Sequence, residues 1–284
     1  MDSFDFKKLY TNIPHDKVID KISDLIKRCF MIKKVDFIKI DDKFNACWKG
    51  VKKTQWTYTC QEVLEMFSFL INNIYVKFKG IVYKQIVGIP MGCDCAPQVA
   101  DLFLYWYEHS YILKAIADKN PVIHTLKYAR RYIDDLNIPN ASRKLCDIIT
   151  KEIYPEDLSI VATNDSKLNT TFLDLDIRVD NNMFICKLYD KRRDFPFKVV
   201  TFPNLKSNVP NGGSYGTFVG ELYRISKSSS DHRDFIVDVR QLVVKLINQN
   251  FERNKLYGTL NNFLKSRPGC LSKYWHNFNV SEFM

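Results

Sequence analysis

Two adjacent aspartates at the tip of a short apolar hairpin constrain this chain more than any other feature. Asp134 and Asp135 follow Tyr132-Ile133 and lie between two short apolar runs, a pattern that predicts a strand, a tight turn and a second strand. Neighbouring carboxylates repel each other, whereas a bound divalent cation removes that repulsion. Aspartate is also common in ordinary polar turns. The tetrapeptide alone therefore leaves two interpretations open, a cation site and a polar turn.

The composition narrows the class of protein. The 284 residues are 46% hydrophobic and 26% charged, which is typical of a globular protein with a sizeable core. The net charge of +10 favours a polyanionic partner, either nucleic acid or an acidic membrane surface. The 8 cysteines include no CxxC pair, so we interpret them as reduced thiols of an intracellular protein, nuclear or cytoplasmic. No apolar run reaches about 18 residues and no signal peptide begins the chain, so we expect no membrane span.

Hydrophobic periodicity predicts an α+β domain that is followed by a helical region. Thr59 and Glu62 form a capping box ahead of an amphipathic helix. Residues 31–57 are rich in lysine and lack a clear period, so we interpret them as an insertion. A strand is expected near the N-terminus, a hairpin that turns at Lys79-Gly80 over 76–86, and strands over 171–179 and 183–189. Helices are expected over about 97–115, 141–153, 214–227, 231–250 and 257–266.

A third carboxylate belongs with the pair. Asp5 ends the first expected strand, and the aromatic residue Tyr10 lies five residues further on. A Gly/Pro loop that opens a helix comes next, and the Asp-Asp hairpin follows it. This order resembles the palm domain of reverse transcriptases.

The resemblance is closest to the Penelope-like retroelement reverse transcriptases, which are relatives of telomerase. It implies a palm, an antiparallel sheet backed by helices, over residues 1–200 and an α-helical thumb over residues 201–284. Prolines and glycines near 203–213 agree with a boundary there. The segments that carry the resemblance are Phe4–His15, Gly88–Gly92 with Ala96-Pro97, Arg131–Asp135, Thr171–Asp176, Leu188–Lys191 and Asn208–Pro210.

The resemblance also implies a reaction. A reverse transcriptase uses an RNA template and a DNA primer, whose 3′-hydroxyl attacks the α-phosphorus of a dNTP. Two Mg²⁺ ions about 3.5–4 Å apart, for which Mn²⁺ can substitute, activate the attacking oxygen and stabilise the leaving one. Asp5 and Asp134 would bridge the two ions, and Asp135 would be a lesser ligand or an electrostatic support.

Further residues match positions that contact the nucleotide. Tyr10 stands where the resemblance places a steric gate against the ribose 2′-hydroxyl, although a core tyrosine is the alternative. Gly88, Pro90 and Gly92 match the loop that supports the incoming nucleotide, where glycine lets the backbone approach a base or phosphate. Simple turn glycines are the alternative there. Lys191 is a candidate general acid for the pyrophosphate leaving group, and a solvated basic turn is the other interpretation.

The second half of the chain carries the basic excess. Between Lys187 and Lys273 there are 16 Lys and Arg against 7 Asp and Glu, which accounts for nearly the whole net charge. Basic helices after a palm resemble a thumb that grips the template–primer backbone. Its candidate nucleic-acid-binding residues are Arg224, Lys227, Arg233, Arg240 and Lys245.

The chain departs from the family at its start. A complete reverse transcriptase has a fingers region before the first palm aspartate, whereas only four residues precede Asp5. We expect a separately encoded fingers segment or a decaying remnant, and weak primer extension by the chain alone. Two alternatives remain: a catalytically inactive fragment that binds nucleic acid or a partner protein, and a basic binding protein with fortuitous carboxylates.

Binding of an RNA–DNA hybrid should weaken steeply as salt rises, because phosphate contacts release counterions. With about six phosphate contacts, affinity should fall about a thousandfold between about 50 and 200 mM salt, measured by fluorescence anisotropy of a labelled hybrid. Removing residues 187–284 should flatten that salt dependence. Equal binding by the shortened chain would contradict the assignment of the basic helices.

Overall fold

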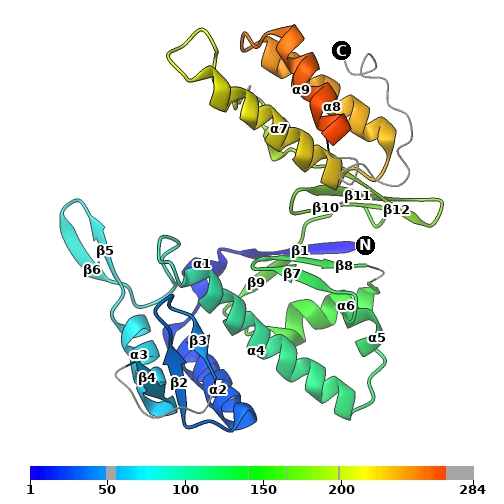
Figure 1. Ribbon diagram of the computed structural model, residues 1–284. Helices are drawn as coiled ribbons and strands as arrows, with labels where there is room; N and C mark the ends of the chain where they lie inside the picture. The colour runs from blue at the N-terminus through cyan, green and yellow to red at the C-terminus, as the bar shows by residue number, and fades with distance from the viewer. Residues whose placement is uncertain (49–55, 140, 165, 198, 267–284) are drawn as a thin grey trace. The chain divides into compact units, whose positions relative to one another are not determined.

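The computed structural model describes residues 1–48, 56–139, 141–164, 166–197 and 199–266 (Figure 1). The chain forms two compact units of mixed helices and strands. The first unit is Asp2–Thr163, and the second begins at Asn164 and includes Met1. Among the described residues, no helix is long and apolar enough to cross a membrane.

The first unit is built on an antiparallel sheet with the strand order β7-β8-β1-β9. Its strands are β1 (Asp2–Lys7), β7 (Arg130–Tyr132), β8 (Asp135–Ile138) and β9 (Ser159–Ala162). The pairing of β1 with β8 places Phe4 opposite Leu136 and Asp5 opposite Asp135. Because side chains alternate along a strand, Phe4 and Phe6 share one face while Asp5 lies on the other.

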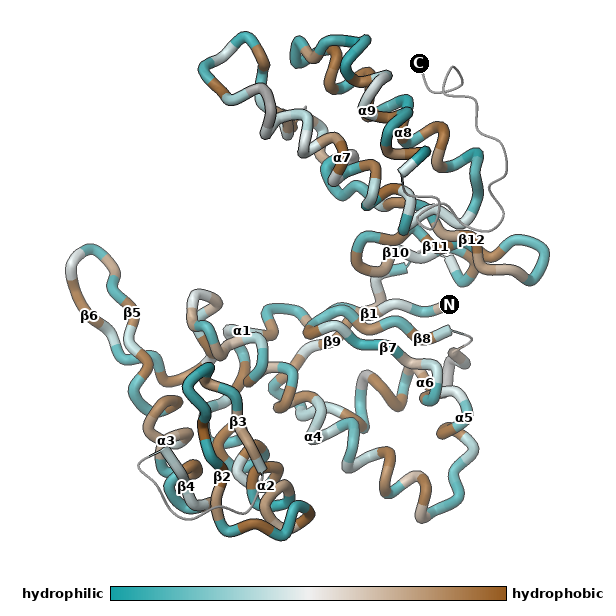
Figure 2. The backbone as a smooth tube through the Cα atoms, viewed as in Figure 1, coloured by the Kyte–Doolittle hydropathy of each residue, from teal (hydrophilic) through white to brown (hydrophobic). Residues whose placement is uncertain are grey.

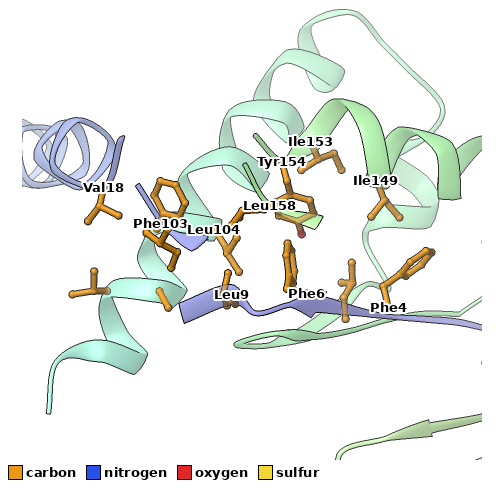
Figure 3. Close-up of a cluster of buried hydrophobic side chains, with 14 of the residues drawn as sticks. Phe4, Phe6, Leu9, Val18, Phe103, Leu104, Ile149, Ile153, Tyr154 and Leu158 are labelled. Atoms are coloured by element: carbon orange, nitrogen blue, oxygen red, sulfur yellow. The ribbon is translucent and has the colours of Figure 1, made fainter. Parts of the chain in front are cut away.

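Helices cover the apolar face of this sheet (Figure 1). They are α4 (Ala96–Ala117), α5 (Ile123–Leu126), α6 (Arg143–Ile148) and the π-helical turn η1 (Ile149–Ile153). Phe4 and Phe6 rise from β1 toward Ile149 and Tyr154 (Figure 3). The rings of Phe6 and Tyr154 meet edge to face with 4.7 Å between their centroids. Each buried phenylalanine contributes roughly 1.5–3 kcal/mol, so the core fixes which face of β1 turns inward.

The rest of the first unit is helical with two small sheets. Its elements are α1 (Leu9–Asn12), α2 (His15–Lys33), β2 (Phe37–Ile40), β3 (Ala46–Cys47), β4 (Thr57–Thr59), α3 (Cys60–Asn72), β5 (Tyr75–Phe78) and β6 (Ile81–Lys84). The predicted capping box is confirmed, since Thr59 and Glu62 satisfy each other's backbone amides at the start of α3. The β5–β6 hairpin is confirmed as well. Of the predicted insertion, β2 and β3 belong to a three-stranded sheet with β4, while residues 49–55 lie outside the described residues.

The second unit joins a β-meander to three helices. Its elements are β10 (Asn169–Phe172), β11 (Leu175–Asp180), β12 (Met183–Leu188), the 3₁₀ turn η2 (Lys191–Asp194), α7 (Asn211–Ser228), α8 (His232–Ile247) and α9 (Arg253–Ser266). Apolar and polar residues alternate along these helices (Figure 2). Phe218, Phe235 and Leu256, one from each helix, are fully buried together. The three helices predicted for this part of the chain are therefore confirmed.

Two features of the second unit differ from the predictions. A single strand over residues 171–179 is wrong: Leu173 takes a left-handed φ of 54°, and Phe172 pairs with Leu175 across a tight turn. The compact units divide between Thr163 and Asn164 rather than near residue 200. Leu188 of β12 is buried in the core of the three helices, which ties the meander to them.

A buried acidic side chain links the meander to α8. Asp190 is 5% exposed and accepts hydrogen bonds from Arg192 Nε at 2.5 Å and from Lys245 Nζ at 3.3 Å. Burial alone would raise the pKa of Asp190, but the two cations outweigh it and lower the pKa to about 2. The charged form is therefore the one that stabilises the fold.

Replacing Asp190 by Asn should lower the free energy of unfolding at neutral pH by about 1–3 kcal/mol, because charge-assisted hydrogen bonds are lost. A depressed folded-state pKa gives stability that is present above pH ~4 and lost as pH falls toward the folded value. The difference between the two proteins should therefore shrink below pH ~4. Chemical denaturation at pH 7, 5, 4 and 3 measures this, and a pH-independent difference would argue against the ion pairs.

Candidate functional site

The turn between β7 and β8 has an unusual backbone. Tyr132 pairs with Asp135, so Ile133 and Asp134 alone form the turn. Ile133 has a φ of 53°, whereas Asp134 has no positive φ. This resembles a type II′ turn, which normally has glycine at its first position. A β-branched residue there costs roughly 1–3 kcal/mol and persists only where the surrounding structure holds it.

Three carboxylates gather at this end of the sheet. Asp5 lies directly opposite Asp135, and the amide of Phe6 donates to the carbonyl oxygen of Asp134 at 3.3 Å. Directly opposed residues have Cβ atoms about 4.5–5.5 Å apart, and like charges in that position destabilise a sheet. The cross-strand partner of Asp5 is thus Asp135, while Asp134 occupies the adjoining turn position. A cation between the strands would offset the repulsion.

The donor set suits one kind of metal. Within the described ranges, no group of three or more His, Cys, Asp or Glu side chains is arranged to hold an ion by itself. Carboxylates supply the hard oxygen ligands that Mg²⁺ prefers, and Mg²⁺ commonly takes one or two carboxylates and completes its shell with water and substrate phosphates. A Mg²⁺ site at Asp5, Asp134 and Asp135 would need water and substrate oxygens to complete it, and it stays a prediction.

Tyr10 belongs to the surroundings of this turn. It lies on the short helix α1, directly after β1, and is partly exposed. Burial raises the pKa of the Tyr10 phenol, and the negative charges of Asp134 and Asp101 raise it further. The phenol is therefore within electrostatic reach of Asp134, and it remains protonated at neutral pH.

Gly88 holds the segment that carries Tyr10. Its φ is +83°, and a Cβ atom there would lie 2.7 Å from the carbonyl oxygen of Tyr10 and 2.8 Å from the Cα of Thr11. The amide of Gly88 donates to Ile13 at 2.8 Å, and the next amide, of Ile89, donates to Tyr10 at 2.6 Å. Only glycine fits here, because the chain's own backbone occupies the space of a side chain.

The other loop residues have less restricted positions. Gly92 is exposed, keeps an ordinary φ and would have no described atom within 4 Å of an added Cβ. Pro90 accepts a hydrogen bond from the amide of Cys93 at 3.0 Å, which turns the chain toward α4. The nucleotide contacts predicted for Gly88, Pro90 and Gly92 stay predictions.

A charged cluster beside the turn was not singled out from the sequence. The Arg131 side chain is 9% exposed and forms ion pairs with Asp101 and Glu108 of α4. The signal was present, because these two acids interrupt the most apolar stretch of the chain at a spacing of two helical turns. Next to the cluster is an open pocket of about 270 Å³, lined by Pro97, Gln98, Asp101, Arg131, Tyr132 and Ile133.

The remaining predicted site residues belong to the second unit. Lys191 is exposed on the turn η2. Lys227 is exposed on α7, with its ammonium group 4.4 Å from the ring centroid of Tyr223. Arg240 is exposed on α8. These three side chains extend toward solvent, where a polyanion can reach them.

Three other predicted phosphate ligands have partners within the unit. Arg224 pairs with Asp174 at 3.1 Å, and Arg233 pairs with Asp231 at 2.9 Å. Lys245 donates to the buried Asp190. Any phosphate contact by these side chains would compete with an existing ion pair, which weakens their case as primary contacts.

Comparisons with known proteins agree with this architecture. No known protein family and no curated protein matches the sequence. The structure is similar to that of telomerase from Candida albicans in complex with a TWJ fragment of telomeric RNA, with a TM-score of 0.57 at 13% identity. Apo telomerase from Candida tropicalis matches with a TM-score of 0.46 at 16% identity.

The matches cover nearly all of this chain but less than half of each telomerase chain. The Candida albicans alignment covers 99% of this chain and 46% of the telomerase chain, and the Candida tropicalis alignment covers 95% and 45%. This chain therefore spans less than half of the telomerase chains that it resembles. The likeness to the Candida albicans structure shows a telomerase-like fold.

Replacing Gly88 by Ala should destabilise the first unit by about 2 kcal/mol or more, since the new methyl group collides with fixed backbone at a left-handed φ. Gly92→Ala is the matched control and should change stability by less than about 0.5 kcal/mol. Urea denaturation followed by tryptophan fluorescence measures both variants. Equal effects of the two substitutions would show that the Gly88 contact is not what holds the loop.

Proposed function

We propose that this chain is the palm and thumb part of an RNA-directed DNA polymerase. The observation that carries the proposal is the cross-strand pairing of Asp5 with Asp135 beside the strained turn at Ile133. A sheet that only needed stability would place neither opposed carboxylates nor a β-branched left-handed residue at this point. The telomerase-like fold and the ordered motifs support the same conclusion, and the motifs favour a Penelope-like type.

The proposed reaction assigns a task to each carboxylate. Two bound Mg²⁺ ions would supply charge neutralisation at the attacking and leaving oxygens. Asp5 and Asp134 would hold these ions through carboxylate oxygens. Asp135, on the strand beside Asp5, would add negative charge and orient its neighbours. The β1–β8 backbone keeps the three side chains in place before substrate arrives, which lowers the entropic cost of the reaction.

Other residues of the first unit would select the nucleotide. The Tyr10 ring, fixed by the loop at Gly88, would exclude a ribose 2′-hydroxyl and so favour a dNTP. Pro90 and Gly92, in the loop that opens α4, would border the same nucleotide. A rigid aromatic wall discriminates well because the unwanted hydroxyl would overlap it.

The second unit would bind the template and primer. Lys227 and Arg240 are exposed candidates for phosphate contact. Arg224, Arg233 and Lys245 are further candidates, whose present ion pairs would have to exchange. Lys191 would be a general acid for the leaving pyrophosphate. The structure of the Candida albicans telomerase contains a TWJ fragment of telomeric RNA, which supports RNA binding here. A fingers segment would complete the triphosphate site.

A second candidate function is nucleic-acid binding without catalysis. The observation that favours it is that no ready-made three-ligand metal cluster exists among the described residues. In this case the basic helices would retain their role while the aspartates would be inert. Primer extension separates the two candidates, because only the polymerase requires Asp134.

Primer extension on an RNA template should require Mg²⁺, and Asp134→Asn should reduce it by about a hundredfold or more, because a metal ligand is lost. Asp174→Asn is the matched control, since Asp174 holds the same position in the tight turn between β10 and β11. The chain is assayed alone and with a reverse-transcriptase fingers segment in trans. No extension in either assay, with hybrid binding intact, would favour the non-catalytic function.

A further inference from the structure

The side chain of Arg131 bonds directly to the strained turn at Ile133. Nη1 of Arg131 donates to the carbonyl oxygen of Ile133 at 3.1 Å. That carbonyl belongs to the peptide that joins Ile133 to Asp134, so the hydrogen bond fixes the peptide plane next to the proposed metal ligand. The Arg131 side chain is only 9% exposed, so water competes little for this contact.

Arg131 is itself held rigidly by α4. Nε donates to Oε1 of Glu108 at 2.5 Å, and Nη2 donates to Oε2 of the same carboxylate at 3.1 Å. Nη1 also donates to Oδ1 of Asp101 at 2.7 Å. The two-point contact with Glu108 sets the plane of the guanidinium group, which a single contact could not do. The orientation of α4 is thereby transmitted to the turn.

Tyr154 completes the arrangement from a third direction. Its hydroxyl donates to Oε1 of Glu108 at 2.7 Å, so this carboxylate is bonded by Arg131 and Tyr154 together. The ring of Tyr154 packs against Phe6, the neighbour of Asp5 on β1. The cluster therefore contacts the turn that carries Asp134, through Ile133, and the strand that carries Asp5, through Phe6.

The pKa values of Arg131 and Tyr154 lie above their usual values. Burial alone would lower the pKa of Arg131, but its bonds to Glu108 and Asp101 raise the pKa above its usual value. Burial, followed by the charge of Glu108, raises the pKa of Tyr154 well above its usual range. Arg131 remains a cation and Tyr154 remains a hydrogen-bond donor near neutral pH. The hydrogen bonds that these two side chains donate therefore do not depend on pH in this range.

We propose that Arg131 is a positioning residue that, supported by Glu108 and Tyr154, holds the Ile133–Asp134 peptide in the conformation required for the reaction. The inference rests on the proposed polymerase function for its kinetic consequence. Its structural content, that Arg131 holds the turn, does not depend on that function. Arg131 has no contact with substrate in this role and acts only through the turn.

The conservative variant Arg131→Lys tests whether the Arg131 side chain holds the turn. Lysine keeps the charge but has a single nitrogen, which cannot bond Glu108, Asp101 and the Ile133 carbonyl at once. A cavity of about 140 Å³ beside the cluster, lined in part by Leu136 and Ile138, gives the lysine chain room without unfolding the core. Arg130→Lys is the matched control, because Arg130 lies on the same strand and its guanidinium donates to the carbonyl oxygens of Lys127 and Ala129, which precede the strand.

Amide hydrogen exchange over residues 130–138 is the first measurement. In the full chain, Arg131→Lys should make the turn exchange about tenfold faster, while Arg130→Lys should leave it unchanged. Tyr154→Phe, which removes one hydroxyl and retains the ring, should give a smaller acceleration in the same segment. Unchanged exchange in Arg131→Lys would overturn the inference, whatever the enzyme assays show.

Primer extension is the second measurement. Arg131→Lys should lower kcat about ten- to a hundredfold and leave the KM for dNTP nearly unchanged, because the turn is misplaced but nucleotide contacts remain. Equal kcat for Arg131→Lys and the parent chain would overturn the positioning role while leaving the polymerase proposal intact. If Arg131→Lys exchanges faster but the parent chain never extends a primer, the result would support the role of Arg131 in holding the turn and count against the polymerase function.

Discussion

The antiparallel pairing of β1 with β8 is the constraint on which the first unit depends. Its register directs Phe4 and Phe6 into the core and leaves Asp5 on the opposite face, beside Asp135. A shift of one residue would exchange these faces, burying a charge and exposing two aromatic rings. The cost of that exchange, several kcal/mol, keeps the carboxylates together even though they repel. Packing on one face of the sheet therefore maintains an unfavourable arrangement on the other.

The proposed site is stabilised by the same elements that form the core. Arg131, which is bonded to α4, donates to the carbonyl oxygen of the strained Ile133, and Gly88 packs directly on the backbone of Tyr10. Both arrangements depend on contacts that a search of the sequence for metal or nucleotide ligands would not identify. They fit the general observation that functional groups need a rigid surrounding shell to be held in a reactive geometry.

The second unit combines an apolar core with a basic surface, and some of its cations form ion pairs with acidic side chains of the same unit. The helices pack through residues such as Phe218 and Phe235, while Arg224 and Lys245 pair with Asp174 and Asp190. The net charge of this part of the chain therefore overstates the number of cations that can meet a phosphate without losing a partner. Affinity for nucleic acid therefore depends on how readily these ion pairs exchange for phosphate as well as on the total charge.

The sequence by itself determined the elements with local causes. The capping box at Thr59, the β5–β6 hairpin and the three C-terminal helices follow from propensity and periodicity, and the turn at Ile133-Asp134 was marked by its composition. Only the tertiary structure decided that Asp5 faces Asp135, that Leu173 breaks a strand, that Gly88 contacts Tyr10 and that Arg131 joins α4 to the turn. Most of these contacts join residues far apart in the chain, and at Leu173 a left-handed backbone overrides the apolar pattern of a continuous strand. Such arrangements depend on the packing of whole elements, which short-range sequence patterns do not encode.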